Sequence, residues 1–313
     1  MFFSVIIPVY NKERHIGNTI KSVLNQSYTD YELIIINDGS TDGSEEIVNV
    51  FNDERIRYYS TINRGVSNAR NLGIAKANGK LIAFLDADDD WYPNHLDILF
   101  RLYTEFPNAG LYSTSYEKRF NPKTILPATF KNIGAANETF MIINDFFESS
   151  SIDSIASSSV AAVPKNVLIE LNGFDPTITH GEDTDLWIRI ALKYRIAFAN
   201  HITAIHNLNT SNSSKQTNIK EKKFLNFSKF EKEELNLPSL KKYLDSNRHS
   251  IALQYKTAGD YPSAKRYTSA IDYKNLDWKH RFLIKQSQIT LRILKKIQIG
   301  ITKYFGVYLS SFK

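Results

Sequence analysis

The stretch Lys80-Leu-Ile-Ala-Phe-Leu-Asp-Ala-Asp-Asp-Asp-Trp91 is the most informative part of this chain for its fold class. Its apolar run predicts a buried strand, which ends abruptly in a cluster of carboxylates. Asp86 and Asp88 are two residues apart, so they point to the same side if the extended backbone continues. In an open α/β sheet, ligands bind at the carboxyl ends of strands, where two carboxylates can hold one divalent cation. Alone the pattern is weak, because an Asp before a helix is often only a cap.

The first hundred residues alternate between strand and helix patterns. Apolar, β-branched runs predict strands, and helical spacing followed by polar or Gly stops predicts helices. Four strands joined by helices predict an α/β fold with a mostly parallel, doubly wound Rossmann-like sheet and right-handed crossovers. The expected strands are 3–9, 31–37, 56–60 and 81–85, and the expected helices are 12–25, 44–51 and 65–77.

Beyond Pro93 the pattern is less regular, and from about residue 220 it is helical to the end. A polar segment over 207–220 predicts a linker or mobile loop, and 252–267 predicts a helical hairpin. The other expected elements are helices to about 106, at 138–147, after Pro164 and at 181–194, and extended segments at 111–116 and 157–163.

Composition excludes several classes of protein. With 313 residues the chain can bury a full α/β core and carry a smaller appendage. The absence of cysteine excludes disulfides, thiolate metal sites and cysteine nucleophiles. The first ten residues resemble a strand rather than a signal peptide, and no apolar run approaches the ~18–20 residues of a membrane span.

The net charge of +6 belongs to a C-terminal tail. From Lys279 onward there are eight Lys or Arg and no Asp or Glu, so the other 31 basic and 33 acidic residues sum to −2. A basic amphipathic helix of this kind can lie on an anionic membrane surface. Packing on the body of the protein, or in a homodimer, is the equally open alternative, and no motif points to nucleic acid. The apolar face of the predicted helix comprises Leu283, Leu291, Leu294, Ile297, Ile301, Tyr304 and Phe305.

Five polar motifs follow predicted strands or open predicted helices. Together and in this order they resemble the family 2 glycosyltransferases, which have the A-type nucleotide-diphospho-sugar transferase fold. The resemblance covers about residues 3–206. The motifs are Ile7-Pro-Val-Tyr-Asn11, Asn37-Asp-Gly-Ser40, Arg64-Gly-Val-Ser-Asn-Ala-Arg-Asn71, Asp86-Ala-Asp-Asp-Asp90 and Gly181-Glu-Asp-Thr-Asp-Leu-Trp187.

The resemblance implies that the nucleotide of a donor lies over the first half of the sheet. Pro8 and Tyr10 belong to the first motif, and Tyr10 is expected to stack on a uracil ring, worth ~1–3 kcal/mol by analogy with other base stacking. Asp38 would accept the imide hydrogen of the base, and Arg70 would reach the base or the diphosphate. The plainer readings are a half-buried aromatic, a turn-and-cap carboxylate and a surface helix cation.

The same resemblance implies a metal site at the acidic cluster. Asp86 would lie near the ribose, and Asp88 would bind Mn²⁺ or Mg²⁺, which neutralises the diphosphate leaving group. His206 is expected as an additional metal ligand, and a purely structural role for it is equally open. Asp89 and Asp90 are expected to support the site or to cap a helix.

The motif that begins at Gly181 resembles the part of the family that carries the catalytic base. Asp183 is expected to remove the proton of the acceptor hydroxyl as that oxygen attacks the anomeric carbon, which gives inversion. Glu182 would contact the donor sugar or orient the site. Trp187 would stack on the acceptor sugar, with core packing as the alternative. Locally, the acidic residues also suit the first turn of a helix.

These expectations define an inverting, metal-dependent glycosyltransferase that moves a sugar from a UDP-sugar to a glycan or lipid-linked acceptor in surface polysaccharide biosynthesis. The expected location is cytoplasmic, peripheral to the inner face of the membrane. The rivals are an inactive sugar-nucleotide-binding or scaffolding relative and a nucleotidyltransferase. The expected domains are a catalytic unit at 1–206, with a nucleotide half to 106 and an acceptor half from 107, then a linker at 207–220 and a helical region at 221–313.

Overall fold

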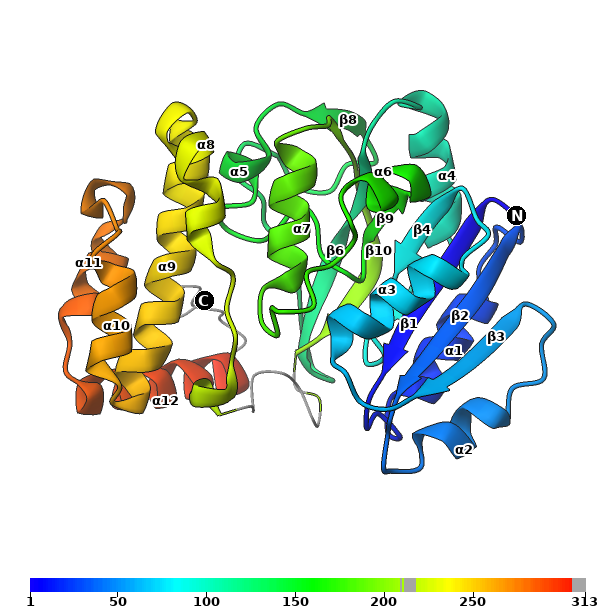
Figure 1. The fold of residues 1–313 in the computed structure, drawn as a ribbon, viewed down its shortest axis with the longest axis horizontal. Coiled ribbons are helices and arrows are strands. Elements are labelled where there is room, and N and C mark those ends of the chain that lie inside the picture. Colours follow the sequence, from blue (N-terminus) through cyan, green and yellow to red (C-terminus); the bar gives the residue numbers. More distant parts are fainter. Residues whose placement is uncertain (209, 211–217, 306–313) are drawn as a thin grey trace.

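The computed structural model describes residues 1–208, 210 and 218–305, the last four of these as backbone only. A twisted sheet runs through the centre of the molecule with helices packed on it, and a group of helices lies beside one end of the sheet (Figure 1). The linker expected at 207–220 lies largely outside the described residues.

The first half of the sheet has the expected alternation of strands and helices. Strand β1 lies between β2 and β4, and β3 extends the sheet on the far side of β2, all in parallel. Their β-branched runs suit this position, because β1, β2 and β4 are almost wholly buried. The elements are β1 (Phe3–Val9), α1 (Ile16–Leu24), β2 (Tyr31–Asp38), α2 (Ser44–Asn49), β3 (Ile56–Thr61), α3 (Val66–Lys76) and β4 (Leu81–Phe84).

The second half of the sheet is mixed. Strands β6 and β10 pair in parallel, whereas β5, β7, β8 and β9 pair antiparallel with their neighbours. The elements are β5 (Asp90–Trp91), α4 (His95–Glu105), β6 (Leu111–Asn121), β7 (Thr124–Pro127), β8 (Phe140–Ile143), α5 (Phe146–Ser149), β9 (Ala161–Pro164), α6 (Lys165–Glu170), α7 (Glu182–Ala191) and β10 (Ile196–Asn207).

The strand order is β3-β2-β1-β4-β9-β6-β10-β5, with β7 beside β6 and β8 beside β10. Strand β9 joins the two halves, because it pairs with β4 on one side and β6 on the other. The expected fold class, a mostly parallel α/β sheet with a C-terminal helical extension, is confirmed.

The helix expected over 138–147 is wrong. Residues Phe140–Ile143 form β8, which pairs antiparallel with the first residues of β10, and only Phe146–Ser149 form a short helix. The Asp145 side chain accepts a hydrogen bond from the Glu148 amide and so caps that helix. The apolar run is ambiguous between helix and strand, and pairing with β10, more than 50 residues away in sequence, decides for strand.

The C-terminal region is helical, as expected. The predicted hairpin is confirmed, because Gly259 turns the chain with φ of 91° and Asp260 caps the next helix at the Ser263 amide. Its described part contains short 3₁₀ turns at Ile219–Glu221, Phe227–Phe230 and Tyr273–Asn275, and the helices α8 (Glu231–Asn236), α9 (Pro238–Ala258), α10 (Tyr261–Thr268), α11 (Trp278–Lys285) and α12 (Gln288–Phe305).

The hydrophobic core is continuous from the sheet into this helical region. Leu240 and Leu244 of α9 and Phe230 belong to the same buried cluster as the strands, and Tyr243 packs on Phe147 with ring centroids 5.7 Å apart. Helix α9 is therefore attached to the sheet unit by core packing. Within the described residues, no helix is long and apolar enough to cross a bilayer.

The expected apolar face of the tail helix is divided between two surroundings. Leu283 and Leu291, for which membrane contact and packing on the protein were both open, are buried, and Leu294 packs against them inside the helical region. A second set of apolar residues on α12 is exposed, and Ile289 and Ile293 belong to it. The side chains of Tyr304 and Phe305 lie outside the described residues.

Candidate donor and transfer site

Asp86 and Asp88 follow β4 at the centre of the sheet, but their side chains have different partners. Asp86 accepts a hydrogen bond from Arg70 Nη2 at 2.7 Å. Asp88 Oδ2 accepts from Lys12 Nζ and from Thr210 Oγ1, both at 2.6 Å. The two carboxylates therefore each neutralise a cation, one on α3 and one just after β1.

The next two acidic residues hold the loop in place. Asp89 is buried and accepts from Ser159 Oγ at 2.5 Å and from the Asn207 amide at 2.8 Å. Burial, with the nearby Asp88 and Asp86 charges, raises its pKa well above the usual range. Asp90 accepts from the Asn207 side chain at 3.0 Å. These contacts agree with the supporting role expected for both residues.

His206, near the end of β10, is close enough to Asp86 and Asp88 for their charges to affect its pKa. Its ring stacks on Tyr116 with centroids 4.1 Å apart, and its Nε2 lies 3.1 Å from Ser157 Oγ. Burial lowers its pKa to about 4 against the opposing effect of the Asp86 and Asp88 charges. The imidazole is therefore neutral at pH 7, which is the form that binds metals.

Asp88 and His206 could hold a divalent cation only together with ligands from outside the protein. Among the described residues, no three His, Asp or Glu side chains are grouped closely enough to hold a metal ion. The Lys12 ammonium beside Asp88 shows that this carboxylate favours a positive charge. A metal here would be held by Asp88, with His206 as the expected second ligand, and would need oxygen atoms from diphosphate or water to complete its coordination.

Arg70 joins the acidic loop to the motif that opens α7. The guanidinium is buried and donates from Nη2 to Asp86 and from Nη1 to Glu182 Oε1 at 2.8 Å. It also lies over the Phe174 ring, 5.0 Å from the centroid. The expected contact of Arg70 with base or diphosphate stays a prediction, because two of its nitrogens already bind carboxylates. Its observed role is to hold two carboxylates together.

Glu182 and Asp183 occupy the first turn of α7. Burial raises the pKa of Glu182 to about 7, the Arg70 charge opposes this and Asp183 adds to it. Burial likewise raises the pKa of Asp183, opposed by Arg70. Asp183 Oδ1 accepts from the Thr184 amide at 2.6 Å. A carboxylate with a raised pKa is a stronger base once ionised, as a proton acceptor requires.

The residues expected around the base of the nucleotide lie at the carboxyl ends of β1 and β2. Tyr10 is 44% exposed and follows β1, whose Pro8 lies beyond the pairing with β4 that ends at Ile6. Asp38 is buried and binds the backbone amides of Arg64 and Gly65 at 2.9 and 2.8 Å. Asp38 therefore fixes the loop that leads into α3, and its contact with a base stays a prediction.

The expectation that Trp187 stacks on an acceptor sugar needs correction. Its side chain is 2% exposed and packs near Phe84 and Phe174, with ring centroids 6.4 and 6.2 Å away. No face is left for a ligand, because this position of α7 points to the sheet. The indole belongs to the core.

Two features of the site were missed from the sequence. Lys12 follows the first motif directly, so its pairing with a carboxylate after β4 could have been inferred from the parallel order of the strands. Tyr243 of α9 feels the charge of Asp183, which together with burial raises its pKa. No local signal indicates that the helical region approaches the expected base.

Comparison with solved structures finds the same fold in a known protein. The crystal structure of Staphylococcus aureus TarS, residues 1–349, in complex with UDP-GlcNAc aligns with a TM-score of 0.66 at 18% identity, covering 98% of this chain and 93% of that chain. At this identity the likeness concerns the fold.

Residues 4–162, about half of the chain, match the family described as glycosyl transferase family 2, and the chain belongs to this family. An uncharacterized glycosyltransferase of Rickettsia felis is 40% identical over 195 residues, which is 62% of this chain and 31% of the relative. The putative teichuronic acid biosynthesis glycosyltransferase TuaG of Bacillus subtilis is 43% identical over 97 residues, 30% of this chain and 38% of that protein. The matches span about a third of these relatives.

Proposed function

We propose that this chain is an inverting, metal-dependent glycosyltransferase that uses a nucleotide-diphospho-sugar. The observation that carries the proposal is the Arg70 bridge, which brings Asp86 and Glu182, 96 positions apart in sequence, into one site beside Asp183. Burial raises the pKa values of Glu182 and Asp183, and adjacent carboxylates with raised pKa values are typical of catalytic sites. A scaffold protein would have no need of it.

In the proposed reaction Asp183 accepts the proton of an acceptor hydroxyl. The hydroxyl oxygen forms a bond to the anomeric carbon while the bond from that carbon to the diphosphate breaks on the opposite face, which inverts the configuration. Glu182, held by Arg70, orients the donor sugar. Bound Mn²⁺ or Mg²⁺ at Asp88 and His206 would supply positive charge to the departing nucleoside diphosphate.

We infer UDP as the nucleotide and a glycan or lipid-linked hydroxyl as the acceptor. Support comes from the exposed Tyr10, from the TarS structures with UDP-GlcNAc and with UDP, and from teichuronic acid biosynthesis in the description of TuaG. Residues 1–206 would form the catalytic unit. The place of action would be the inner face of the cytoplasmic membrane, where the basic, partly apolar surface of α11 and α12 meets anionic lipid.

Calorimetric titration of UDP, GDP and ADP, each with and without Mn²⁺, tests the donor site. We expect UDP to bind most tightly, and to do so only with Mn²⁺. Asp88→Ala should remove the effect of the metal on UDP affinity and leave the weak metal-free binding unchanged. Asp97→Ala, in the first turn of α4 and without a role in the proposed site, is the matched control.

Two results would count against the proposal. If no nucleotide binds in a metal-dependent manner, the scaffolding alternative is favoured. If UDP binds but incubation of a UDP-sugar with pyrophosphate yields sugar phosphate and UTP, the protein is a nucleotidyltransferase.

A further inference from the structure

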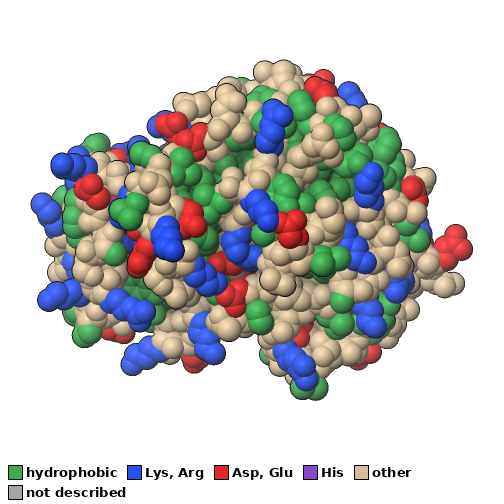
Figure 2. Space-filling model, turned by 45° about the horizontal axis from the view of Figure 1, so that its top comes forward, with side chains coloured by type: hydrophobic (Ala, Val, Ile, Leu, Met, Phe, Trp, Pro, Cys, Tyr) green, Lys and Arg blue, Asp and Glu red, His purple; other side chains and the backbone are tan. Residues whose placement is uncertain are grey.

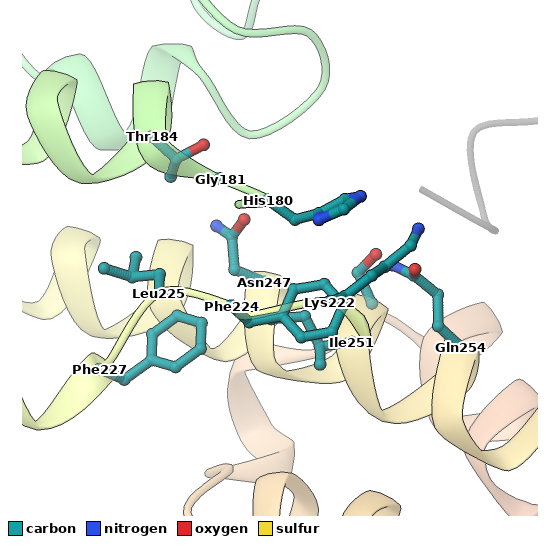
Figure 3. Close-up of a pocket in the computed structure, with 11 residues that line it drawn as sticks. His180, Gly181, Thr184, Lys222, Phe224, Leu225, Phe227, Asn247, Ile251 and Gln254 are labelled. Atoms are coloured by element: carbon teal, nitrogen blue, oxygen red, sulfur yellow. The ribbon is translucent and has the colours of Figure 1, made fainter. Parts of the chain in front are cut away.

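A pocket outside the site described above lies between the helical region and the start of α7 (Figure 3). It has a volume of about 230 Å³, and its walls come from the first turn of α7, the segment 222–227 and one face of α9. None of the sequence motifs predicted it, because its walls are far apart in the chain. The lining residues that matter most are Thr184, Lys222, Phe224, Asn247, Ser250 and Gln254.

This pocket is next to the expected catalytic base. Thr184, which lines it, donates from both its amide and its hydroxyl to Asp183 Oδ1, at 2.6 and 3.3 Å. On α9, Asn247 lies one turn after Tyr243, whose pKa is raised by burial and by the Asp183 charge. Ser250 and Gln254 continue the same face of α9, away from Asp183. The pocket therefore includes the residue that follows the expected base and extends along α9.

The charge of the pocket is one-sided. No Asp or Glu is among its described lining residues, whereas Lys222 is, and its side chain is half-buried. Within the described part of the chain, no residue forms a hydrogen bond or an ion pair with the Lys222 ammonium. Burial lowers the pKa of Lys222, and the charge of Lys295 on α12 lowers it further. The Lys222 ammonium, on a pocket lining that carries no described carboxylate, can therefore stabilise a bound anion.

The other lining side chains suit a sugar or polyol. Asn247 and Gln254 carry amides that can both donate and accept hydrogen bonds with hydroxyl groups, and Ser250 adds a hydroxyl. Phe224 and Phe227 provide an apolar wall, as Figure 3 shows. A pocket with a few polar groups beside aromatic side chains is the usual form of a small-molecule site.

We propose that this pocket is the acceptor subsite and that it binds a sugar or polyol carrying a phosphate or carboxylate group. The anion lies at Lys222 and the reactive hydroxyl points past Thr184 to Asp183. This inference rests on the proposed function, because it assigns the acceptor of the same reaction. Selectivity for an anionic acceptor is then a property of the helical region and not of the sheet.

The test is a saturation-transfer NMR titration with four small probes. Glycerol 3-phosphate and glucuronate are the anionic probes, and glycerol and glucose are the neutral ones. The protein is kept saturated with UDP and Mg²⁺, so that the donor site is filled. We expect the better anionic probe to bind about tenfold more tightly than its neutral partner, as one charge-assisted hydrogen bond allows.

Two pairs of variants test the residues. Lys222→Ala should abolish the preference for the anionic probe, whereas Lys223→Ala, its exposed neighbour, should keep it. Asn247→Ala should weaken anionic and neutral probes alike, whereas Asn236→Ala, on the exposed end of α8, should not. A phosphate preference supports a sugar-phosphate or polyol-phosphate acceptor, and a carboxylate preference supports a uronic acid.

The proposal is overturned if neutral and anionic probes bind the wild-type protein equally, or if Lys222→Ala and Lys223→Ala have equal effects. It is also overturned if the probes bind only when UDP and Mg²⁺ are left out, since they would then occupy the donor site. UDP titration of the Lys222→Ala variant should match the wild-type protein. Failure of the wild-type protein to bind UDP would instead refute the proposed function, while probe binding would still report on the pocket.

Discussion

At the scale of single residues, Arg70 determines how the carboxylates of the site behave. One guanidinium neutralises Asp86 and Glu182 at once, and its buried position strengthens both contacts. Asp183 feels the same positive charge but forms no described hydrogen bond with it. This leaves Asp183 as the carboxylate best placed to accept a proton.

Replacing Asp183 by Asn should abolish transfer while UDP binding stays nearly intact. The amide cannot take a proton, and loss of a general base costs about 10²- to 10⁴-fold in rate. Its Oδ1 can still accept from the Thr184 amide, so the fold should be kept. Sugar transfer would be measured together with calorimetric UDP titration and a thermal melt. A near wild-type rate in the Asp183→Asn variant would show that another group is the base.

Glu182 should make the stability of the protein depend on pH. Its pKa is raised to about 7 in the folded state, so the folded protein holds this proton more tightly than the unfolded chain does. The contribution of Glu182 to the free energy of unfolding is therefore fully present below about pH 4.5 and is lost as the pH rises through 7. The Glu182→Gln variant should not lose this stability. Between pH 5 and pH 8, the free energy of unfolding of the wild-type protein should therefore fall by on the order of 1–3 kcal/mol more than that of the variant.

Urea unfolding of both proteins at pH 5, 6, 7 and 8 measures this effect. Glu105→Gln, on the exposed end of α4, serves as the control and should follow the wild-type curve. A difference between Glu182→Gln and the wild-type protein that is constant across these pH values would contradict the raised pKa.

At the scale of elements, α12 has two apolar faces with different surroundings. Leu291 is fully buried against α9 and α11, whereas Ile289 is 71% exposed. The helical region carries exposed hydrophobic side chains among basic and acidic ones on the face drawn in Figure 2. Two copies of this face would repel each other, because no Asp or Glu follows Asp277 in the chain. The face is therefore better suited to an anionic bilayer than to a second copy.

The double variant Ile289→Ser/Ile293→Ser should bind phosphatidylglycerol vesicles at least about tenfold more weakly than the wild-type protein. Each exposed isoleucine buries apolar area in the bilayer interface, on the order of 1 kcal/mol per side chain. Vesicle sedimentation would be compared with phosphatidylcholine vesicles and at higher salt, where wild-type binding should fall. Ile169→Ser, a 62% exposed isoleucine on α6, is the matched control.

The vesicle proposal fails if the wild-type protein binds both lipids equally, or if the double variant binds as well as the control. Sedimentation equilibrium tests the alternative that this face of α12 forms a homodimer. A wild-type dimer that the double variant abolishes would assign the face to a homodimer.

At the scale of the whole molecule, the helical region and the sheet share one core. Leu244 of α9 is fully buried in the same cluster as β1 and β4, and Lys229 binds both Asp175 and Asp185, the latter on α7. The helical region is thus part of the structure that shapes the site. The domain boundary expected at residue 206 stays a prediction. The hydrophobic core continues from the sheet into the helices that follow this position.

Leu244→Ala should lower the free energy of unfolding by about 2–5 kcal/mol, as expected for a large-to-small change at a buried position. Because the core is continuous, tryptophan fluorescence and far-ultraviolet circular dichroism should report one coincident transition in both proteins. Trp91 and Trp187 report on the sheet, and Trp278 on the helices. Two separated transitions would show that the helical region is an independent domain.

The order of the elements and the positions of the carboxylates at their ends could be predicted from the sequence alone. Strands 3–9, 31–37 and 81–85 could be read because each is a short apolar run with a clear stop, and local pattern suffices for such runs. The prediction failed at Phe140–Ile143, where pairing with a distant strand overrides local preference. It also failed at Trp187, since burial depends on what packs against the helix.

Which charged side chains come into contact could not be predicted without the folded structure. The contact of Arg70 with Glu182, the Lys12–Asp88 pair and the pocket between α7 and α9 each join residues more than 30 positions apart. Contacts of that kind depend on strand order and on how α9 packs against the sheet, which no local pattern contains. The sequence gives the chemical type of each side chain. The partners of a side chain, its burial and hence its pKa depend on the folded structure.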